Sequence, residues 1–269
     1  MIDKVREIEE QEILKAKVRR RVSANCIVAL VVFRDHHSSV PGKNSWDLCG
    51  KPVYYWSIKA AVESKYLEKV LVWTEVKGVR EVLGDMLDKI VFIDRTIDEC
   101  REPPWKIMND LKRYDSRVDT GSVVVVQNLL GDRIKNALDF DPTLLLKFQV
   151  NRPLVRTGTF DRVVERYFED DIAERCMAVS EIDRVTWQNH PDQSKYIVRS
   201  GLSNFAVRRQ ELPAMYVSAG PYITSYEWTG TQRTVYVVVP YLESIEIHSV
   251  DDMEIAELLM KKRLLEGNS

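Results

Sequence analysis

At residues 27–33 the chain reads Ile27-Val28-Ala29-Leu30-Val31-Val32-Phe33, an unbroken apolar run rich in β-branched side chains. Such a run is typical of a strand buried on both faces, as in a parallel sheet covered by helices. Helical patterns follow at 53–63 and 78–87, and further strand-length segments lie at 69–74, 90–93 and 144–148. Because strand and helix alternate, we predict an α/β fold with a mostly parallel open sheet and helices on both faces.

The remaining segments extend this pattern to both ends of the chain. Residues 1–22 are dense in charge with spaced apolar residues, which predicts an N-terminal helix that ends in a basic run. Additional helices are expected at 160–168 and 253–265, and additional strands at 122–126, 176–180, 222–224, 235–239 and 245–247. We therefore expect a separate helix over 1–22 and a single domain over 23–269.

Composition and charge exclude several classes of protein. The chain of 269 residues is 45% hydrophobic and 30% charged, which is typical of a soluble globular protein. Its net charge of −2 provides no basic excess, so neither nucleic acid nor a membrane is expected as a partner. The charged N-terminus argues against a signal peptide, and the four scattered cysteines form neither a zinc motif nor a disulfide framework. We expect a cytoplasmic protein.

The polar loop after the first strand, from Arg34 to Asn44, carries the first candidate site residues. In open α/β sheets, ligands bind at the carboxyl ends of the strands, where this loop begins. Arg34 and Lys43 supply two fixed cations, and the Pro41-Gly42 turn lets the backbone approach a ligand. A triphosphate needs such positive charge and hydrogen-bond donors. The same residues are equally typical of a polar loop that only turns the chain.

Several motifs, in order, resemble the acylneuraminate cytidylyltransferases, the family of CMP-sialic acid synthetases. In that family the first strand leads into a loop that ends P-x-K-N and is followed by G-K-P. This chain matches with Pro41-Gly42-Lys43-Asn44 and Gly50-Lys51-Pro52, and then with segments at 149–154, 209–213, 219–222 and 244–257. The agreement spans residues 25–262. The resemblance implies a Rossmann-like fold of the nucleotide-diphospho-sugar transferase type.

The resemblance also implies roles for residues on the nucleotide side. Arg34 and Lys43 would hold the triphosphate and stabilise the charge that develops during transfer, which makes them the expected catalytic residues. Asn44 would hold the nucleotide, and Arg95 stands where the family has an arginine near the base. The expected nucleotide is CTP.

On the acceptor side, the resemblance points to Gln149, Arg152 and Arg209. In the family, the arginine that corresponds to Arg209 reaches the acceptor from a partner subunit. Residues 185–215 would then be a dimerisation element, so we expect a homodimer. The added Arg152 would suit the carboxylate of a sugar acid, and equally a phosphonate or a phosphate.

Glu246 and His248 stand where the family has two aspartates that hold magnesium against the triphosphate. We therefore expect a divalent metal, Mg²⁺ or Mn²⁺, at these residues, although imidazole suits magnesium poorly. His248 would be better suited to zinc, manganese or a water-mediated contact, and the alternative is a partly exposed strand residue without a ligand. Asp35, His36 and His37 are a second candidate ligand set from the opposite wall.

These features predict a nucleotidyltransferase that transfers CMP from CTP to a sugar acid or a similar anionic acceptor and releases pyrophosphate. Because both family aspartates and one loop lysine are missing, the alternative is a catalytically impaired homologue that acts as a nucleotide-binding or scaffold protein. A third possibility is a sugar-nucleotide transferase that uses another base, such as GTP. Transferases of that kind often have a longer glycine-rich first loop, which this chain lacks.

Overall fold

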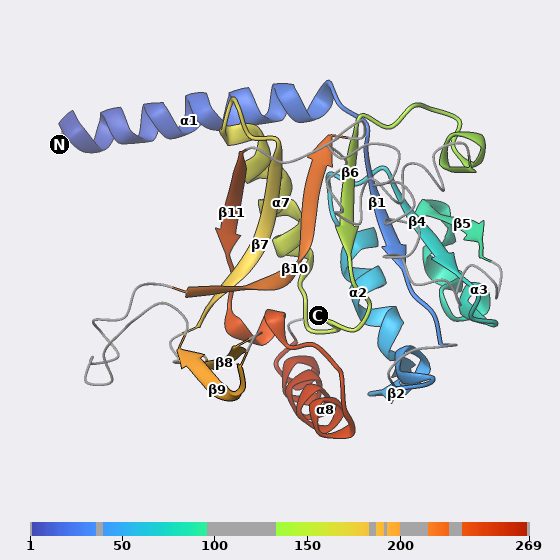
Figure 1. Ribbon diagram of the computed structural model, residues 1–269. Helices are drawn as coiled ribbons and strands as arrows, with labels where there is room; N and C mark the ends of the chain where they lie inside the picture. Colours follow the sequence, from blue (N-terminus) through green and yellow to red (C-terminus); the bar gives the residue numbers. More distant parts are fainter. Residues whose placement is uncertain are drawn as a thin grey trace.

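A seven-stranded sheet forms the centre of the molecule, with the strand order β11-β7-β10-β6-β1-β4-β5 (Figure 1). The computed structural model describes residues 2–35, 40–95, 133–182, 187–190, 193–199, 215–225 and 233–267. The strands of this sheet are β1 (Ile27–Val32), β4 (Lys69–Thr74), β5 (Ile90–Asp94), β6 (Leu144–Phe148), β7 (Arg175–Ile182), β10 (Met215–Ser225) and β11 (Thr234–Val238). Only β10 runs antiparallel to its neighbours β6 and β7, while the other neighbouring pairs are parallel.

The apolar run at 27–33 forms the middle of the sheet, as predicted. β1 pairs with β4 on one side and β6 on the other, and its residues from Ile27 to Val31 are fully buried. Helices α2 (Val53–Val62) and α7 (Thr157–Glu169) pack against one face of the sheet, where they form the largest hydrophobic cluster. A short helix at 133–137 packs on the other face through Ile134. The prediction of a mostly parallel sheet covered on both faces is confirmed.

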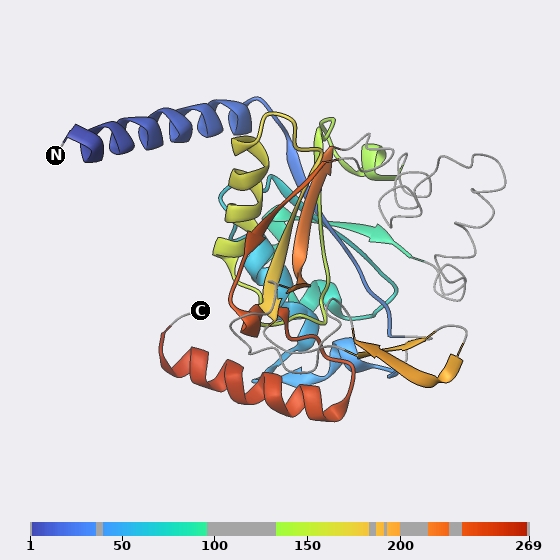
Figure 2. The same ribbon diagram turned by 60° about the vertical axis from the view of Figure 1, so that its left-hand side comes forward.

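The helices at the two ends of the chain differ in how they meet the body. α1 (Ile2–Ser23) projects from the body, and only its carboxyl half packs against α7 (Figure 2). Arg21 fastens that half by donating to the carbonyl oxygen of Phe168 at 2.9 Å. α8 (Val250–Leu265) lies across the end of the sheet, and Ser249 and Asp252 form a capping box at its start. Within the described residues, no helix combines the length and apolar character needed to cross a membrane.

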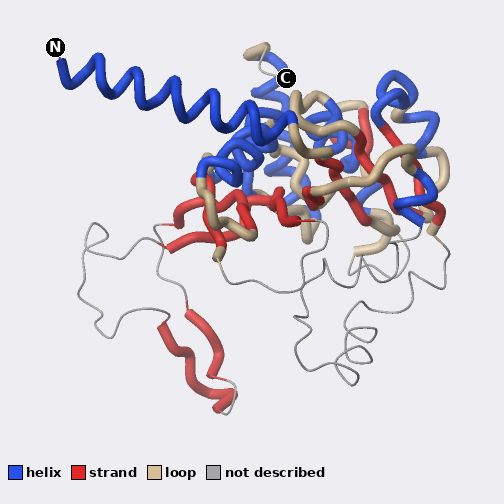
Figure 3. The backbone as a smooth tube through the Cα atoms, turned by 90° about the horizontal axis from the view of Figure 1, so that it is seen from above, coloured by secondary structure: helices blue, strands red, loops and turns tan. Residues whose placement is uncertain are grey.

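Smaller elements complete the fold. A short hairpin, β2 (Asp47–Leu48) with β3 (Lys51–Pro52), precedes α2, and a second hairpin pairs β8 (Trp187–His190) with β9 (Gln193–Arg199). Figure 3 shows the second hairpin set apart from the sheet. The remaining short helices are η1 (Lys43–Ser45), α3 (Val79–Val82), η2 (Gly84–Lys89) and η4 (Tyr241–Ser244).

Two sequence predictions differ from the structure. The helix expected at 78–87 is split into α3 and η2, which meet at Leu83 and Gly84. The strand expected at 245–247 is wrong, because this segment is irregular and follows η4. Its alternating pattern arises instead from a single buried residue, Ile247, whose backbone N–H donates to the carbonyl oxygen of Asn151 at 2.8 Å. The strand expected at 122–126 lies outside the described residues.

The strand order reverses next to β1. The chain runs from β1 to β4 and β5 on one side and then returns to β6 on the opposite side. The loops that leave the carboxyl ends of β1 and β6 therefore diverge from adjacent strands. Ligands of open α/β sheets bind at such a reversal, so these two loops frame the candidate site.

Candidate functional site

Three chain segments meet beyond the carboxyl ends of β1 and β6. They are the loop after β1, the loop after β6, and the irregular segment 245–249 before α8. The Lys43 ammonium of the first loop donates to the carbonyl oxygen of Ile247 at 3.0 Å. The N–H of the same Ile247 donates to Asn151 in the second loop at 2.8 Å. Ile247, which is fully buried, therefore links both loops.

A tight turn sets the direction of the first loop. Gly42 has φ 73°, in the left-handed region that glycine adopts without a steric penalty, and it begins the short helix η1. The next two side chains, Lys43 and Asn44, turn inward and are only 8% and 5% exposed. Asn44 donates to the carbonyl oxygen of Arg34 at 2.7 Å and so fastens the loop to the end of β1. An ammonium carries three N–H donors, so Lys43 keeps donors beyond the one used on Ile247.

An ion pair dominates the second loop. Arg152 donates through Nη2 to Oε2 of Glu246 at 2.7 Å, and the two side chains are 9% and 23% exposed. Arg152 also donates through Nε to Gln149 at 2.9 Å and through Nη1 to the carbonyl oxygen of Ser218. All three nitrogen atoms of its guanidinium therefore donate hydrogen bonds to described residues. Three of the predicted site residues thus form one hydrogen-bonded group: Gln149, Arg152 and Glu246.

A β-bulge in β10 presents Ser218 to this arginine. The pairing of β10 with β7 shifts register between Ser218 and Tyr222, and Gly220 within this stretch has φ 127°. A Cβ at Gly220 would lie 3.6 Å from Cδ of Arg152, which is an ordinary van der Waals contact, so the positive φ is the reason that glycine is favoured here. Bulges of this kind re-aim a strand next to a site.

The contacts of Glu246 do not fit a magnesium ligand. Its second oxygen, Oε1, accepts from Nδ2 of Asn151 at 2.7 Å and lies 2.9 Å from Nε2 of His248. Magnesium prefers carboxylate and water oxygens, whereas this carboxylate is surrounded by an arginine, an amide and an imidazole. The described residues contain no group of three or more histidine, cysteine, aspartate or glutamate side chains placed to share a metal ion. His248 is 60% exposed, in agreement with a position near solvent.

The second candidate ligand set is only partly described. His36 and His37 lie outside the described residues. Asp35 accepts a hydrogen bond from the hydroxyl of Ser45, and its backbone N–H donates to Glu75 at 2.9 Å. These contacts give Asp35 a role in holding the loop after β1.

Arg95 lies at the end of the neighbouring strands. Its guanidinium stacks on the ring of Trp73 at 4.7 Å and donates to the carbonyl oxygen of Phe33 at 3.2 Å. Arg95 therefore approaches the carboxyl end of β1 from the β4 side, whereas the ion pair of Arg152 lies on the β6 side. Arg34, whose backbone Asn44 holds, is half-buried. Arg209 lies outside the described residues.

Sequence reasoning missed two residues beside this site. Asn151, which lies within the matching segment 149–154, donates to the carboxylate of Glu246. Lys147 in β6 is 8% exposed, and burial lowers its pKa to about 7. A signal for Lys147 was present, because it is the single charged residue in the strand Leu144-Leu145-Leu146-Lys147-Phe148.

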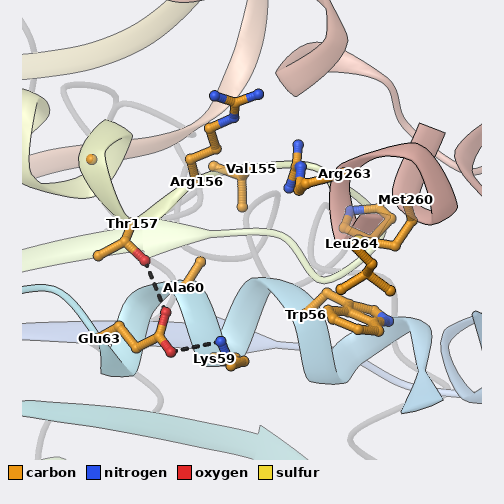
Figure 4. Close-up of a pocket in the computed structure, with 12 residues that line it drawn as sticks. Trp56, Lys59, Ala60, Glu63, Val155, Arg156, Thr157, Met260, Arg263 and Leu264 are labelled. Atoms are coloured by element: carbon orange, nitrogen blue, oxygen red, sulfur yellow. Dashed lines mark hydrogen bonds and ion pairs between the residues drawn. The ribbon is translucent and has the colours of Figure 1, made fainter. Parts of the chain in front are cut away.

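A cavity of about 230 Å³ lies beside this site but includes none of the predicted site residues (Figure 4). It is lined by α2, the start of α7 and the end of α8. Three of its polar side chains bind one another: Lys59 pairs with Glu63 at 2.6 Å, and Thr157 donates to Glu63 at 3.2 Å. The cavity is also smaller than the ~300–1,000 Å³ that is typical of small-molecule sites. We therefore place the candidate site at the strand ends.

Comparisons with solved structures agree with this fold. The structure of a CMP:2-keto-3-deoxy-manno-octonic acid synthetase complexed with CTP matches with a TM-score of 0.56 at 13% identity, over 88% of this chain and 99% of that chain. The 4-diphosphocytidyl-2C-methyl-D-erythritol synthase of Anaerococcus prevotii matches with a TM-score of 0.56 at 12% identity, over 89% and 98%. At these identities the matches establish the fold.

Sequence comparisons find relatives of the same kind. The CMP-N,N'-diacetyllegionaminic acid synthase of Legionella pneumophila is 25% identical over 245 residues, which cover 87% of this chain and 96% of the relative. The 3-deoxy-manno-octulosonate cytidylyltransferase of Bdellovibrio bacteriovorus is 26% identical over 145 residues, or 54% of this chain and 47% of the relative. No family model matches the chain. In sequence, the chain is therefore similar to CMP-sugar synthases and cytidylyltransferases, and its fold is the one that these solved structures share.

Proposed function

We propose that this chain transfers CMP from CTP to a sugar acid, or to an acceptor with a similar anionic group, and releases pyrophosphate. The observation that carries the proposal is the meeting of the loops after β1 and β6 at the reversal of strand order, in a chain that aligns with a CMP-sugar synthase over 87% of its length. Each relative named above is a cytidylyltransferase or a CMP-sugar synthase by its own name.

In the proposed reaction, an acceptor oxygen attacks the α-phosphorus of CTP in line with the leaving group. A phosphorus–oxygen bond forms to the acceptor, the bond from the α-phosphorus to the bridging oxygen breaks, and pyrophosphate leaves with its electron pair. The acceptor hydroxyl loses its proton to solvent water. Such chemistry needs positioning and charge stabilisation more than covalent help from the protein.

The loop after β1 supplies these needs on the nucleotide side. We assign Lys43 and Arg34 to the triphosphate, where Lys43 would use the N–H donors that Ile247 does not occupy. Asn44 and Arg95 are assigned to the nucleotide. Asn44 acts by fixing the loop on Arg34, and Arg95 lies on Trp73 at the end of β4.

On the acceptor side, we assign Gln149 and Arg152 to the acceptor wall, together with Arg209 of a second copy in a homodimer that includes residues 185–215. Gln149 is exposed at the end of β6 and accepts from Arg152, which would hold its amide in one orientation. The homodimer and a cytoplasmic location stay predictions.

A divalent cation, when bound, offsets negative charge on the triphosphate and pyrophosphate oxygens. The relatives make such a cation, Mg²⁺ or Mn²⁺, an expectation for this chain too. The carboxylate of Glu246 is bound by Arg152, Asn151 and His248, so it does not fit the role of a metal ligand. Glu246 is therefore assigned no metal in the proposed reaction. The charge stabilisation assigned to this chain's own residues comes from Lys43 and Arg34.

The test is pyrophosphate release from each of the four nucleoside triphosphates, with Mg²⁺ or Mn²⁺, against a panel of sugar acids and small phosphonates. We expect release with CTP and a sugar acid, and loss of release in Lys43→Met. Lys261→Met, which changes a lysine that is 60% exposed on α8, is the matched control and should behave like the wild-type protein. Release with GTP in place of CTP would contradict the choice of base.

A second candidate function is a nucleotide-binding protein without turnover. The observation that favours it is the ion pair of Glu246 with Arg152. The resemblance to the family implies that a carboxylate at this position binds a metal ion. CTP binding by calorimetry together with no pyrophosphate release from any pair of substrates would support this second function over the first.

A further inference from the structure

Lys147 lies near the carboxyl end of β6, between two uncharged neighbours. In the register of the sheet, it is paired with Leu30 of β1 and Tyr222 of β10. It is 8% exposed, although lysine is among the residues that proteins bury least often. The strand is otherwise composed of Leu144, Leu145, Leu146 and Phe148, so its pattern alone calls for an apolar residue here.

The side chain lies on the sheet face opposite to α2 and α7. Residues two apart in a strand share a face, so Lys147 lies on the face of Leu145, which packs with Leu30 and Trp73. Arg95 is on this same face, because its guanidinium stacks on Trp73. Lys147 and Arg95 therefore flank β1 on one side of the sheet, and both are near the strand ends that frame the candidate site.

The cations around the site differ in their partners. Arg152 is neutralised by Glu246, and Lys43 donates to the carbonyl oxygen of Ile247. The ammonium of Lys147 makes no hydrogen bond or ion pair with the described residues. Tyr222, which is paired with Lys147 across the sheet, carries a second cation, because the guanidinium of Arg175 stacks on its ring at 4.9 Å. Lys147 is thus a buried amine whose described surroundings provide no counterion.

Burial without a counterion disfavours the charged form of an amine, and the pKa of Lys147 falls to about 7 accordingly. The fold does not require a buried amine here, because leucine or methionine would fill the position without the free-energy cost of burying a charge. An anionic group that bound beside Lys147 would restore the favourable charged form. A site that holds an unpaired cation in the empty state is therefore prepared for an anion.

We propose that Lys147 binds the carboxylate of the acceptor sugar acid and takes the role that the sequence suggests for Arg152. The inference rests on the proposed function. The acceptor, rather than the triphosphate, is favoured as the ligand of Lys147 because Lys43 and Arg34 in the loop after β1 are already assigned to the triphosphate. Lys147, by contrast, is on β6, beside β10 and two residues before the exposed Gln149. Arg152, with its charge neutralised, becomes a residue that positions Gln149.

The first test compares steady-state kinetics of wild-type protein, Lys147→Met, Lys147→Arg and the control Lys135→Met, which changes an exposed lysine on the 133–137 helix. We expect the KM for the sugar acid to rise about tenfold or more in Lys147→Met, with the KM for CTP within about twofold of wild type. Lys147→Arg should recover part of the loss. Methionine fits an apolar strand, so the thermal midpoint of Lys147→Met should equal or exceed that of wild type.

Two kinetic outcomes overturn the inference. One is an unchanged KM for the sugar acid in Lys147→Met, and the other is a rise in the KM for CTP instead. In either case the wild-type protein still releases pyrophosphate, so the proposed function stands while the inference fails. If the wild-type protein releases none from any substrate pair, the proposed function fails, and the assignment of an acceptor group fails with it.

The second test needs no turnover. Lysines are acylated at pH 7 with a limiting amount of an amine reagent, and the modification of Lys147 is read by peptide mass spectrometry against Lys135. We expect Lys147 to react, because its pKa of about 7 leaves much of the amine unprotonated. 3-Deoxy-manno-octulosonate should protect it at least threefold, and CTP should not. Protection by CTP alone, or no modification of Lys147 without ligand, would overturn the inference.

Discussion

The loop after β1 and the segment 245–249 face each other across the site, yet they relate differently to the family they resemble. The loop after β1 keeps the lysine and asparagine of P-x-K-N, and both side chains are buried and fastened to backbone carbonyls. The segment 245–249 replaces both expected aspartates, and Glu246 is bound by Arg152 instead of being open to a cation. The predicted triphosphate loop thus keeps the lysine and asparagine of the motif, whereas an ion pair occupies the position where the resemblance predicts a metal ligand.

The comparison teaches that the same position can hold a carboxylate for two physical reasons. An aspartate beside a triphosphate binds a metal cation, whereas the carboxylate of Glu246 neutralises the charge of the buried Arg152 guanidinium. The predictions below separate these roles by removing one partner at a time.

The largest expected effect on stability is at Arg152. Arg152→Ala leaves the partly buried Glu246 without its cation, so we expect the free energy of unfolding to fall by about 3–5 kcal/mol. Urea denaturation measures it. Arg233→Ala is the matched control, because Arg233 is 52% exposed in its pair with Asp170 and its loss should destabilise the protein far less than the loss of Arg152. Equal losses in the two variants would show that the Arg152 ion pair has no special structural weight.

At Lys43, the expected effect is on activity. Lys43→Met removes the buried ammonium from the loop after β1, and kcat/KM for CTP should fall about 100-fold, since a preorganised donor to developing charge is lost. The measurement is pyrophosphate release at saturating acceptor, with Lys261→Met as the control. A fall of less than about threefold would remove Lys43 from the triphosphate site and weaken the contrast between the two regions.

Glu246→Gln tests whether the carboxylate serves a metal. The amide keeps the shape of the side chain but leaves the charge of Arg152 uncompensated, so we expect the free energy of unfolding to fall by about 1–3 kcal/mol. The concentration of Mg²⁺ or Mn²⁺ that gives half-maximal turnover should change by less than about twofold. An increase of tenfold or more in that concentration would instead identify Glu246 as a metal ligand.

The smallest effect is expected at the cap of α8. Ser249→Ala removes the hydroxyl that accepts from the N–H of Asp252, which should cost about 1 kcal/mol. Asp252 in turn accepts a hydrogen bond from the backbone N–H of His248, and this is the main cause of the lowered pKa of Asp252. Hydrogen bonds with Ser249 lower the pKa by a smaller amount. A carboxylate with a lowered pKa stabilises the fold above its ordinary pKa of about 4 and loses that contribution as pH falls.

Asp252→Asn should therefore destabilise the protein at pH 7. Near pH 2, where the Asp252 carboxyl of the wild-type protein is protonated in both the folded and the unfolded state, the two proteins should be equally stable. Urea unfolding of both proteins at the two pH values measures the difference. A constant difference at both pH values would indicate that the carboxylate charge of Asp252 does not contribute. Either result leaves the site itself unaffected, because the cap lies outside the ion pair of Arg152 and Glu246.

Much of the fold could be predicted from local pattern. β1 is a continuous apolar strand, and β4 and β6 are apolar apart from Lys69, Thr74 and Lys147, because both faces of the sheet are covered. Residues 245–247, Ile-Glu-Ile, alternate as a strand with one buried face would, but a segment this short cannot show whether a strand partner exists. In the structure its buried residue bonds to two loops instead.

The site was predicted in part, and its pairings were not predicted. The Pro41-Gly42 turn is local, and the left-handed φ of Gly42 is what that turn requires. The contact of Arg152 with Glu246 joins residues 94 positions apart, and no periodicity links them. Lys147 is visible in the sequence as a lysine within an apolar strand. Its lack of a counterion depends on neighbours from β1 and β10, which only the sheet order reveals.

The measurement that tests the central claim most directly is a ³¹P NMR time course of CTP with the protein, Mg²⁺ and a sugar acid such as 3-deoxy-manno-octulosonate. CMP transfer predicts a new phosphodiester resonance that grows together with pyrophosphate in equal amounts, and that is absent with Lys43→Met. CTP that stays intact across the sugar acids tested, or that yields CMP and pyrophosphate without the phosphodiester, would contradict the assignment of this chain as a CMP-transferring enzyme.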